Sequence, residues 1–170
     1  AHRMREPGKQ SPDGRLKEAV YSRKICSEVA AILRGYGYKV EIDYEPIDLP
    51  KTMQSSSATL ERSRELGMRV NVVNELCRQN GKDNVLYVSI HVNAAGADGK
   101  WHDARGWQVQ VSTKASNNSK ILAECLFDAA NTKGIKTRKP SALQKYWPQS
   151  LYVLNNTNCA AVLTENMFQD

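Results

Sequence analysis

Residues 85–93 read VLYVSIHVN, and this stretch decides the fold class. Its first six residues are almost continuously apolar, which is typical of a strand that is covered on both faces of a sheet. The apolar run ends at His91, so a titratable side chain stands at the end of a buried strand. Residues 160–164, AAVLT, repeat this arrangement, because the apolar run there ends in Glu165.

Segments with helical periodicity alternate with these strands. The pattern predicts a helix that Ser11 or Asp13 caps and Gly35 ends, two further helices at 59–78 and 117–131, and strands at 38–44 and 106–111. The first helix is expected to bury an apolar stripe made of Leu16, Val20, Ile25, Val29, Ile32 and Leu33. Such alternation predicts an α/β fold: a single domain with a mostly parallel, twisted sheet flanked by helices on both faces.

The length and composition fit one globular domain. The chain has 170 residues, 41% of them hydrophobic and 25% charged, which excludes a disordered or a fibrous chain. No apolar run approaches the roughly 18–20 residues of a membrane span, so no span is expected. The opening residues AHRM lack the hydrophobic region of a signal peptide, and none is predicted.

The charge balance is basic, with 24 Lys and Arg against 18 Asp and Glu, a net charge of +6. A basic chain favours polyanionic partners such as nucleic acid, anionic lipid or the acidic polymers of a bacterial wall. The basic residues are scattered, however, and the aromatic residues are not interleaved with them as on a nucleic-acid stacking surface. An ordinary solvated surface is therefore the preferred interpretation of the charge.

Four cysteines lie far apart in the sequence, with no CxxC pair: Cys26, Cys77, Cys125 and Cys159. Cys26 and Cys125 occupy apolar positions of predicted helices. Buried thiols outside disulfides are the favoured interpretation, because a reduced cysteine behaves as a small hydrophobic residue. Disulfides are the less favoured alternative.

His91 and Glu165 are the first candidates for chemistry, because ligands of such sheets bind at the carboxyl ends of strands. His91 is equally well a ligand or a hydrogen-bonded histidine at the rim of the core. Glu165 enters a half-buried setting, where its pKa is expected to rise, as suits general acid–base work. Glu18 opens the first helix and is explained equally by the helix dipole. His102 is expected in solvent, and His2 at a disordered terminus.

The sequence holds no GxSxG, P-loop, GxGxxG or HExxH motif. No serine or cysteine stands in a recognisable nucleophile setting. If the protein is an enzyme, a metal site is the chemistry that remains.

Three stretches carry a family resemblance: PGKQSPDGRLKE at 7–18, SIHVNAAGADGKWHDARGW at 89–107 and AVLTENMFQD at 161–170. In this order they resemble the zinc-dependent N-acetylmuramoyl-L-alanine amidases of the catalytic type 3 family, and most closely the branch found in Bacteroides-like bacteria. The resemblance covers most of the chain and is weakest across 46–58.

The resemblance implies one Zn²⁺ ion with His2, Glu18 and His91 as its ligands, and Glu165 as the catalytic base. His2 stands in Ala-His-Arg, where the family has Gly-His-Gly. The resemblance further implies one catalytic amidase domain over residues 1–170, in which the family's first strand and C-terminal helix are absent.

Other residues are expected around this site. The loops at 46–58 and 96–105 would form its rim, and Asn93 and Asn166 would orient substrate or water. Arg105 suits an acidic stem peptide, and a plain basic surface explains it equally well. Candidates for sugar stacking are Trp101, Trp107 and Trp147, of which Trp107 is more readily a core residue because it alternates with Val109.

The function implied by the resemblance is hydrolysis of peptidoglycan at the amide between N-acetylmuramic acid and the L-alanine of the stem peptide. We expect a monomer that acts outside the cytoplasm, in the periplasm or after secretion, and that binds peptidoglycan but no nucleic acid. A catalytically impaired homologue that only binds the cell wall is the alternative. A nucleic-acid-binding protein is a distant third.

Overall fold

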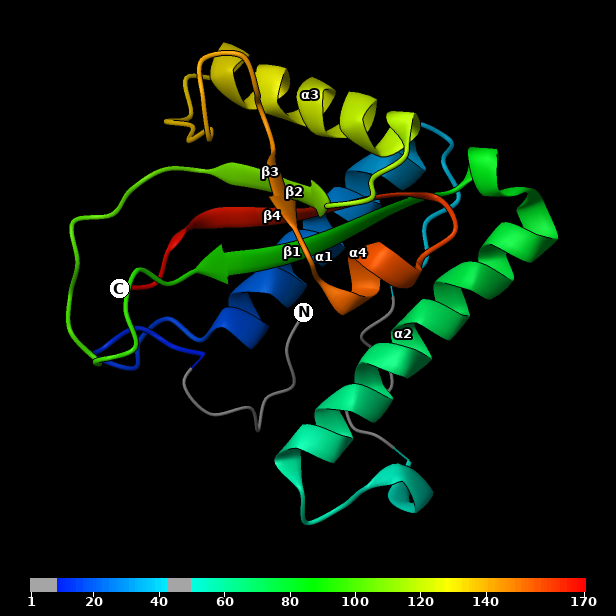
Figure 1. Cartoon of the computed structure of the whole chain (residues 1–170), viewed down its shortest axis with the longest axis horizontal. Coiled ribbons are helices and arrows are strands. Elements are labelled where there is room, and N and C mark those ends of the chain that lie inside the picture. The colour runs from blue at the N-terminus through cyan, green and yellow to red at the C-terminus, as the bar shows by residue number, and fades with distance from the viewer. Residues whose placement is uncertain (1–8, 43–49) are drawn as a thin grey trace.

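The computed structural model describes residues 9–42 and 50–170, which form a four-stranded sheet with helices on both faces (Figure 1). The helices are α1 (Glu18–Gly35), α2 (Ala58–Asn80), α3 (Asn117–Thr132) and α4 (Tyr152–Asn156), with short 3₁₀ turns η1 (Lys51–Met53) and η2 (Lys82–Asn84). The strands are β1 (Leu86–Asn93), β2 (Gln108–Ser112), β3 (Trp147–Gln149) and β4 (Ala160–Phe168). Within these described ranges, no helix is both long and apolar enough to cross a membrane.

The strand order is β1-β4-β2-β3. β1 runs parallel to β4, and β2 runs parallel to β3, whereas β2 and β4 are antiparallel. The predicted α/β fold with a mostly parallel sheet and helices on both faces is therefore confirmed, with one antiparallel pairing that makes the sheet mixed. The short β3 was not expected from the sequence, because three residues including Pro148 carry no periodicity.

Each face of the sheet has its own core, because the side chains of β4 alternate between the two faces. On one face α3 covers the strands, and the cluster there is built around Val109, Val111, Ala123, Phe127 and Val162. On the other face α2 and α4 cover the strands, through Val70, Val153, Leu154, Ala161 and Leu163. This double coverage is the physical reason for the continuous apolar run of β4.

Helix α1 corrects two predictions. It begins at Glu18, because Ser11 and Asp13 bond to each other (2.6 Å) in a preceding turn instead of capping the helix. Its buried residues are Glu18, Ala19, Ser22 and Ala30, while Val20 and Ile32 of the predicted stripe are 51% and 60% exposed. The helix therefore packs against β1 through its acidic and small residues, and the predicted apolar stripe is wrong.

The predicted strand at 38–44 is also not found in its described part, because residues 38–42 have no regular structure. Residues 43 and 44 lie outside the described residues. Alternation marks a half-buried surface, but a strand also needs a neighbour to pair with. Here the Arg34 side chain, rather than a strand, donates to the Val40 carbonyl (2.6 Å).

None of the four cysteines, all of which lie in the described residues, forms a disulfide. Cys77 and Cys159 are buried and lie together in a small cluster below α2. Cys125 is exposed and Cys26 is half-buried, so the expectation of burial is wrong for Cys125. The reason is that Cys125 lies on the outer side of α3, next to the face that packs through Ala123 and Phe127.

Candidate active site

One row of three side chains crosses the sheet at the carboxyl end of β1. His91 of β1 is the register partner of Glu165 of β4, and Glu165 is the partner of Gln108 of β2. Register partners project from the same face of a sheet, so the three side chains are neighbours. The expectation that His91 and Glu165 meet at one edge is confirmed.

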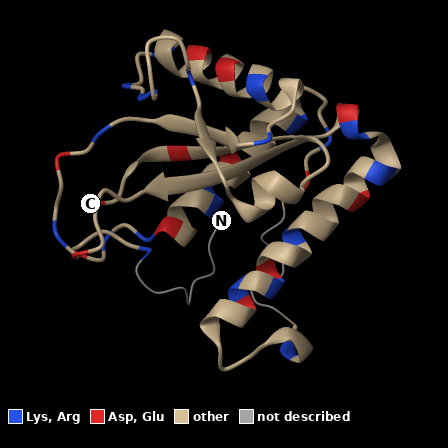
Figure 2. Ribbon diagram, in the orientation of Figure 1, with Lys and Arg blue, Asp and Glu red and all other residues tan. Residues whose placement is uncertain are grey.

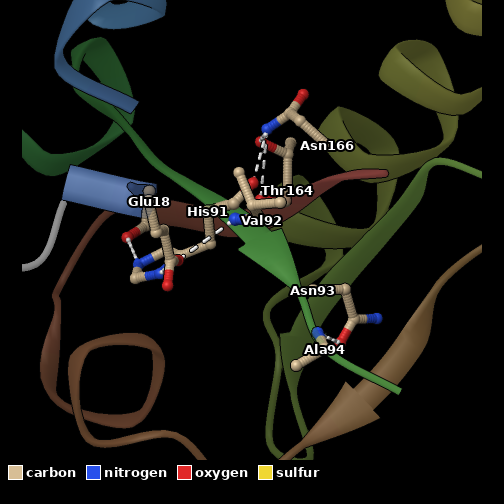
Figure 3. Close-up of polar contacts among 8 residues, drawn as sticks. Glu18, His91, Val92, Asn93, Ala94, Thr164 and Asn166 are labelled. Atoms are coloured by element: carbon tan, nitrogen blue, oxygen red, sulfur yellow. Dashed lines mark hydrogen bonds and ion pairs between the residues drawn. The ribbon is translucent and has the colours of Figure 1, made fainter. Parts of the chain in front are cut away.

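Glu18 joins this row from the first turn of α1 (Figure 3). Its Oε1 lies 2.9 Å from Nδ1 of His91 and accepts the backbone N–H of Val92 (3.1 Å). The other ring nitrogen of His91 lies 3.0 Å from the hydroxyl of Ser89. Glu18 is only 1% exposed, and burial of a carboxylate is costly unless it is paired. The helix dipole alone therefore does not account for Glu18, whose carboxylate fixes the His91 ring.

The pKa of the Glu165 carboxyl group is raised, as its position at the end of a buried strand predicted. Burial, and secondly the negative charge of Glu18, raise its pKa to about 8, against a smaller lowering by Lys9. Its Oε2 is buried and has no hydrogen-bond partner within the part of the chain that the structure describes. A carboxyl group in such a setting exchanges a proton near neutral pH, which is the property required of a general acid or base.

The side chain of Asn166, the next residue, lies on the opposite face of β4. Its side-chain NH₂ group donates to the main-chain carbonyl of His91 (2.9 Å) and to Oγ1 of Thr164 (3.1 Å), as Figure 3 shows. Its side-chain oxygen accepts the Nε1–H of Trp107 (3.0 Å). The predicted role of Asn166 in orienting substrate or water is therefore replaced by a structural one. Asn93 lies at the edge of the site, where its Oδ1 accepts the N–H of Ala94 (2.9 Å).

A bulge follows Glu165 in β4. The register passes from His91 opposite Glu165 to Asn93 opposite Phe168, so three residue steps on β4 match two on β1. Met167 takes up the extra residue with φ of 68°, a left-handed conformation that is uncommon outside glycine. Because of the bulge, Phe168 lies on the same side as Glu165 instead of the opposite side.

These residues open into a cleft of about 810 Å³. Its lining includes Glu18, His91, Glu165 and Phe168, together with Trp147 and the start of α4. Within the described residues, the expected rim loop 96–105 contributes only Ala104 to the lining of the cleft. Of the other expected rim loop, 46–58, residues 50–58 contribute nothing to the lining, and residues 46–49 lie outside the described part.

The three tryptophans have different places. Trp147 lines the cleft, Trp101 is 63% exposed outside it, and Trp107 belongs to the core beneath α3, as favoured above. Arg105 bonds to the carbonyls of His102 and Ala104 at 2.6 and 2.8 Å and is not among the cleft-lining residues described.

Asp170 holds the loop that leaves β1. Its carboxylate accepts the backbone N–H groups of Ala95 and Gly96, each at 2.9 Å. Gly96 also lies against His102, where a Cβ would come within 2.3 Å of Nε2. His102 bonds to Asp98 (2.9 Å) and its side chain is 32% exposed, so it stays outside the row of His91, Glu165 and Gln108. Sequence patterns gave no signal for Asp170, because its partners are backbone groups.

Two of the three expected zinc ligands meet in the structure. A carboxylate oxygen of Glu18 and a ring nitrogen of His91 lie together, and the second nitrogen of His91 has an outer partner in Ser89, as ligating histidines generally do. This donor set fits a zinc ion. His2 lies outside the described residues, and the described residues alone hold no group of three metal-binding side chains.

Charge is distributed over the surface rather than concentrated in one patch. Figure 2 shows both signs along α2 and α3. Four cations line the cleft, namely Lys9, Arg62, Arg69 and Arg138. This arrangement supports the interpretation of an ordinary solvated surface.

Comparison with known proteins gives consistent matches. The profile of a family described as N-acetylmuramoyl-L-alanine amidase matches residues 1–170. An endolysin of Bacillus phage SPP1 is 28% identical over 108 residues, which are 64% of this chain and 38% of that protein. The chain thus aligns with well under half the length of this curated relative.

Solved structures share the fold. The CwlD amidase of Clostridioides difficile, solved in complex with the GerS lipoprotein, superposes with a TM-score of 0.78 at 21% identity, over 99% of this chain and 79% of that one. The catalytic domain of CwlV, an N-acetylmuramoyl-L-alanine amidase from Bacillus (Paenibacillus) polymyxa var. colistinus, gives 0.71 at 18% identity, over 99% and 77%. At these identities the likeness shows a common fold.

Proposed function

Because the chain belongs to the N-acetylmuramoyl-L-alanine amidase family, we propose that it is a zinc-dependent hydrolase that cleaves peptidoglycan between N-acetylmuramic acid and the L-alanine of the stem peptide. The observation that carries this proposal is the row of His91 and Glu165 in the cleft, with Glu18 bonded to His91. It brings two side chains of types that zinc prefers as ligands next to a carboxyl group of raised pKa.

Glu18 and His91 would hold the zinc ion, and we propose His2 as the third ligand. When bound, zinc polarises the scissile carbonyl and acidifies the attacking water. Ser89 would keep the His91 ring oriented through its hydroxyl, and the Val92 N–H would do the same for the Glu18 carboxylate. These outer bonds support ligand geometry in metal sites generally.

Glu165 would act as the catalytic base and then as the acid. It takes a proton from the attacking water while the water oxygen bonds to the lactyl carbonyl carbon. It returns the proton to the amine nitrogen of L-alanine as the C–N bond breaks. The products are a free lactyl carboxylate and a stem peptide with a free amino terminus, and no covalent enzyme intermediate is required.

The test is a digest of purified peptidoglycan with and without a zinc chelator, in which new N-terminal alanine and new reducing sugar ends are both measured. Chelator-sensitive release of alanine without reducing ends is expected. Glu165→Ala should abolish the release while the zinc content stays at the wild-type level. Reducing ends without alanine would mean a glycosidase, and no release by a folded, zinc-loaded protein would mean a wall-binding homologue that has lost catalysis.

The remaining features of this proposal follow from the substrate. Peptidoglycan lies outside the cytoplasm, so we propose that the protein acts there, in the periplasm or after secretion. We also propose that residues 1–170 work as one catalytic domain and as a monomer. Sedimentation of the purified protein tests the monomer, and fractionation of cells that produce the protein tests the compartment.

A further inference from the structure

Arg138 lines the same cleft as His91 and Glu165 but has no part in the chemistry described above. We propose that its guanidinium binds a carboxylate of the stem peptide and makes the enzyme prefer acidic stem peptides over amidated ones. This inference rests on the proposed function, because the stem peptide is the leaving half of that substrate.

The main chain holds Arg138 firmly beside the start of β2. Trp107 donates its N–H to the carbonyl of Lys136 (2.8 Å), and Arg138 donates its N–H to the carbonyl of Trp107 (2.7 Å). These two bonds fix residues 136–138 next to the row that contains Gln108 and Glu165. Arg138 therefore does not depend on a loose loop for its place in the cleft.

The aliphatic part of the Arg138 side chain is fixed as well, because it crosses Gly106. A Cβ at position 106 would lie 2.9 Å from Cγ of Arg138 and 3.1 Å from the carbonyl oxygen of Lys136. Gly106 also has φ of +114°, which side chains other than glycine rarely adopt. The glycine thus leaves the space that the arginine side chain uses.

The guanidinium itself rests on an aromatic ring. Cζ of Arg138 lies 4.9 Å from the centre of the Phe168 ring, within the range of a cation–π contact. Phe168 reaches this side of the sheet only through the bulge at Met167. A cation–π contact engages the positive charge of the guanidinium without using its N–H groups as hydrogen-bond donors, and these donors match a carboxylate in two-pronged geometry.

No acid in the described part of the chain neutralises Arg138. Three carboxyl groups line the cleft with it. Glu18 is bonded to His91, Glu65 forms an ion pair with Arg69 at 2.8 Å, and Glu165 makes no ion pair with Arg138. A pre-positioned cation that has no acidic partner among residues 9–42 and 50–170 is suited to an anionic group of a ligand.

The chemistry of the substrate supplies that group. In a stem peptide the residue after L-alanine is a D-glutamate whose α-carboxyl group is either free or amidated. Both forms have the same size, but only the free acid has a negative charge. A guanidinium fork would therefore distinguish them, whereas a neutral polar site would accept both.

The experiment uses two synthetic N-acetylmuramoyl peptides that differ only in this group, carboxylate in one and carboxamide in the other. We expect the wild-type kcat/KM to be about ten- to a hundred-fold higher for the acid, the range of a charge-assisted hydrogen bond. Arg138→Ala should remove this preference through a higher KM for the acid, and Arg138→Lys should keep part of it. Lys139→Ala, which changes an exposed neighbour outside the described cleft lining, should keep the full preference.

The outcomes separate this inference from the proposed function. Equal hydrolysis of both peptides by the wild type, or an equal loss for both in a folded Arg138→Ala variant, would overturn the role of Arg138 and leave the amidase intact. If neither peptide is hydrolysed, the amidase proposal fails. In that case calorimetric titration still tests the role of Arg138, because it measures the affinity of the protein for each peptide. Tighter binding of the acid that is lost in Arg138→Ala would support the role of Arg138. Equal affinities for the two peptides would refute it.

Discussion

The side-chain amide of Asn166 is bonded to the main-chain carbonyl of His91 at 2.9 Å, across the β1–β4 pair. The neighbouring Glu165 stands in register with the same His91. One dipeptide of β4 thus serves His91 in two ways: Glu165 lies beside it in the cleft, and Asn166 ties down its backbone from the opposite face. The geometry of the row therefore depends on a residue that does not face the cleft.

Asn166→Ala is expected to destabilise the protein. The change removes the bonds to His91 and Thr164 and leaves the indole N–H of the buried Trp107 without its acceptor. We expect a loss of about 1–3 kcal/mol in the free energy of unfolding, measured by urea denaturation. Asn156→Ala is the matched control, because the exposed Asn156 amide bonds only within its own helix, to the Tyr152 carbonyl. Equal stabilities of the two variants would refute the structural role.

The stability of the zinc-free protein should fall with rising pH because of Glu165. Its pKa is raised from 4.5 to about 8, so folding favours the protonated form. The stabilisation is complete below pH 4.5 and is lost as the pH rises towards 8, by an amount on the order of a few kcal/mol. Urea denaturation of the chelated protein at pH 5 and pH 8 measures this loss. Glu165→Gln should flatten the difference, and unchanged pH dependence in that variant would contradict the assignment.

His91→Ala should remove bound zinc. The variant lacks the ring nitrogen that lies 2.9 Å from the Glu18 carboxylate, so one of the two proposed ligands within the described residues is gone. Elemental analysis of the purified protein measures the metal directly and does not depend on turnover. His102→Ala is the control, since His102 bonds to the exposed Asp98 away from the row and should leave the metal content unchanged. Full zinc content in the His91 variant would remove it from the proposed ligands.

The cysteines should react with iodoacetamide in a definite order. Cys125 is exposed and should be alkylated first in the native protein. Cys159 should be protected, because burial, and secondly the neighbouring Cys77, raise the pKa of its thiol to about 12. Peptide mapping after brief labelling measures the extent of alkylation at each site separately. In urea, where the protein is unfolded, the two cysteines should be alkylated at similar rates. Native labelling of Cys159 as fast as Cys125 would show that the cluster below α2 opens readily.

The strands β1, β2 and β4 and the meeting of His91 with Glu165 were predictable from sequence, because both rest on local patterns. An apolar run that ends in a titratable residue marks the carboxyl end of a buried strand, and two such ends meet when their strands pair. The helices at 59–78 and 117–131 were found for a similar reason, and both are capped by a serine, Ser57 and Ser116. The raised pKa of Glu165 also followed from its position.

What the sequence did not reveal depends on contacts between distant segments. The helical pattern alone explained Glu18 equally by the helix dipole, and only the family resemblance placed it with His91, because the two residues come together only in the folded chain. The apolar residues of α1 predicted the wrong buried face for the same reason: helical periodicity identifies a stripe, but packing decides which stripe is covered. Arg138 carried no motif, since its setting combines Gly106, Trp107 and Phe168 from three separate parts of the chain.

The bulge at Met167 decides which face of the sheet Phe168 occupies. Glu165 and Phe168 are three residues apart, and in a regular strand two residues at an odd spacing project from opposite faces. Loss of the irregularity without a change of length would therefore turn Phe168 to the α3 side, away from Arg138. Residues 165–168 join the proposed catalytic carboxyl group to the aromatic support of a cation, so a protein engineer who grafts this segment must transfer all four residues together with their bulge.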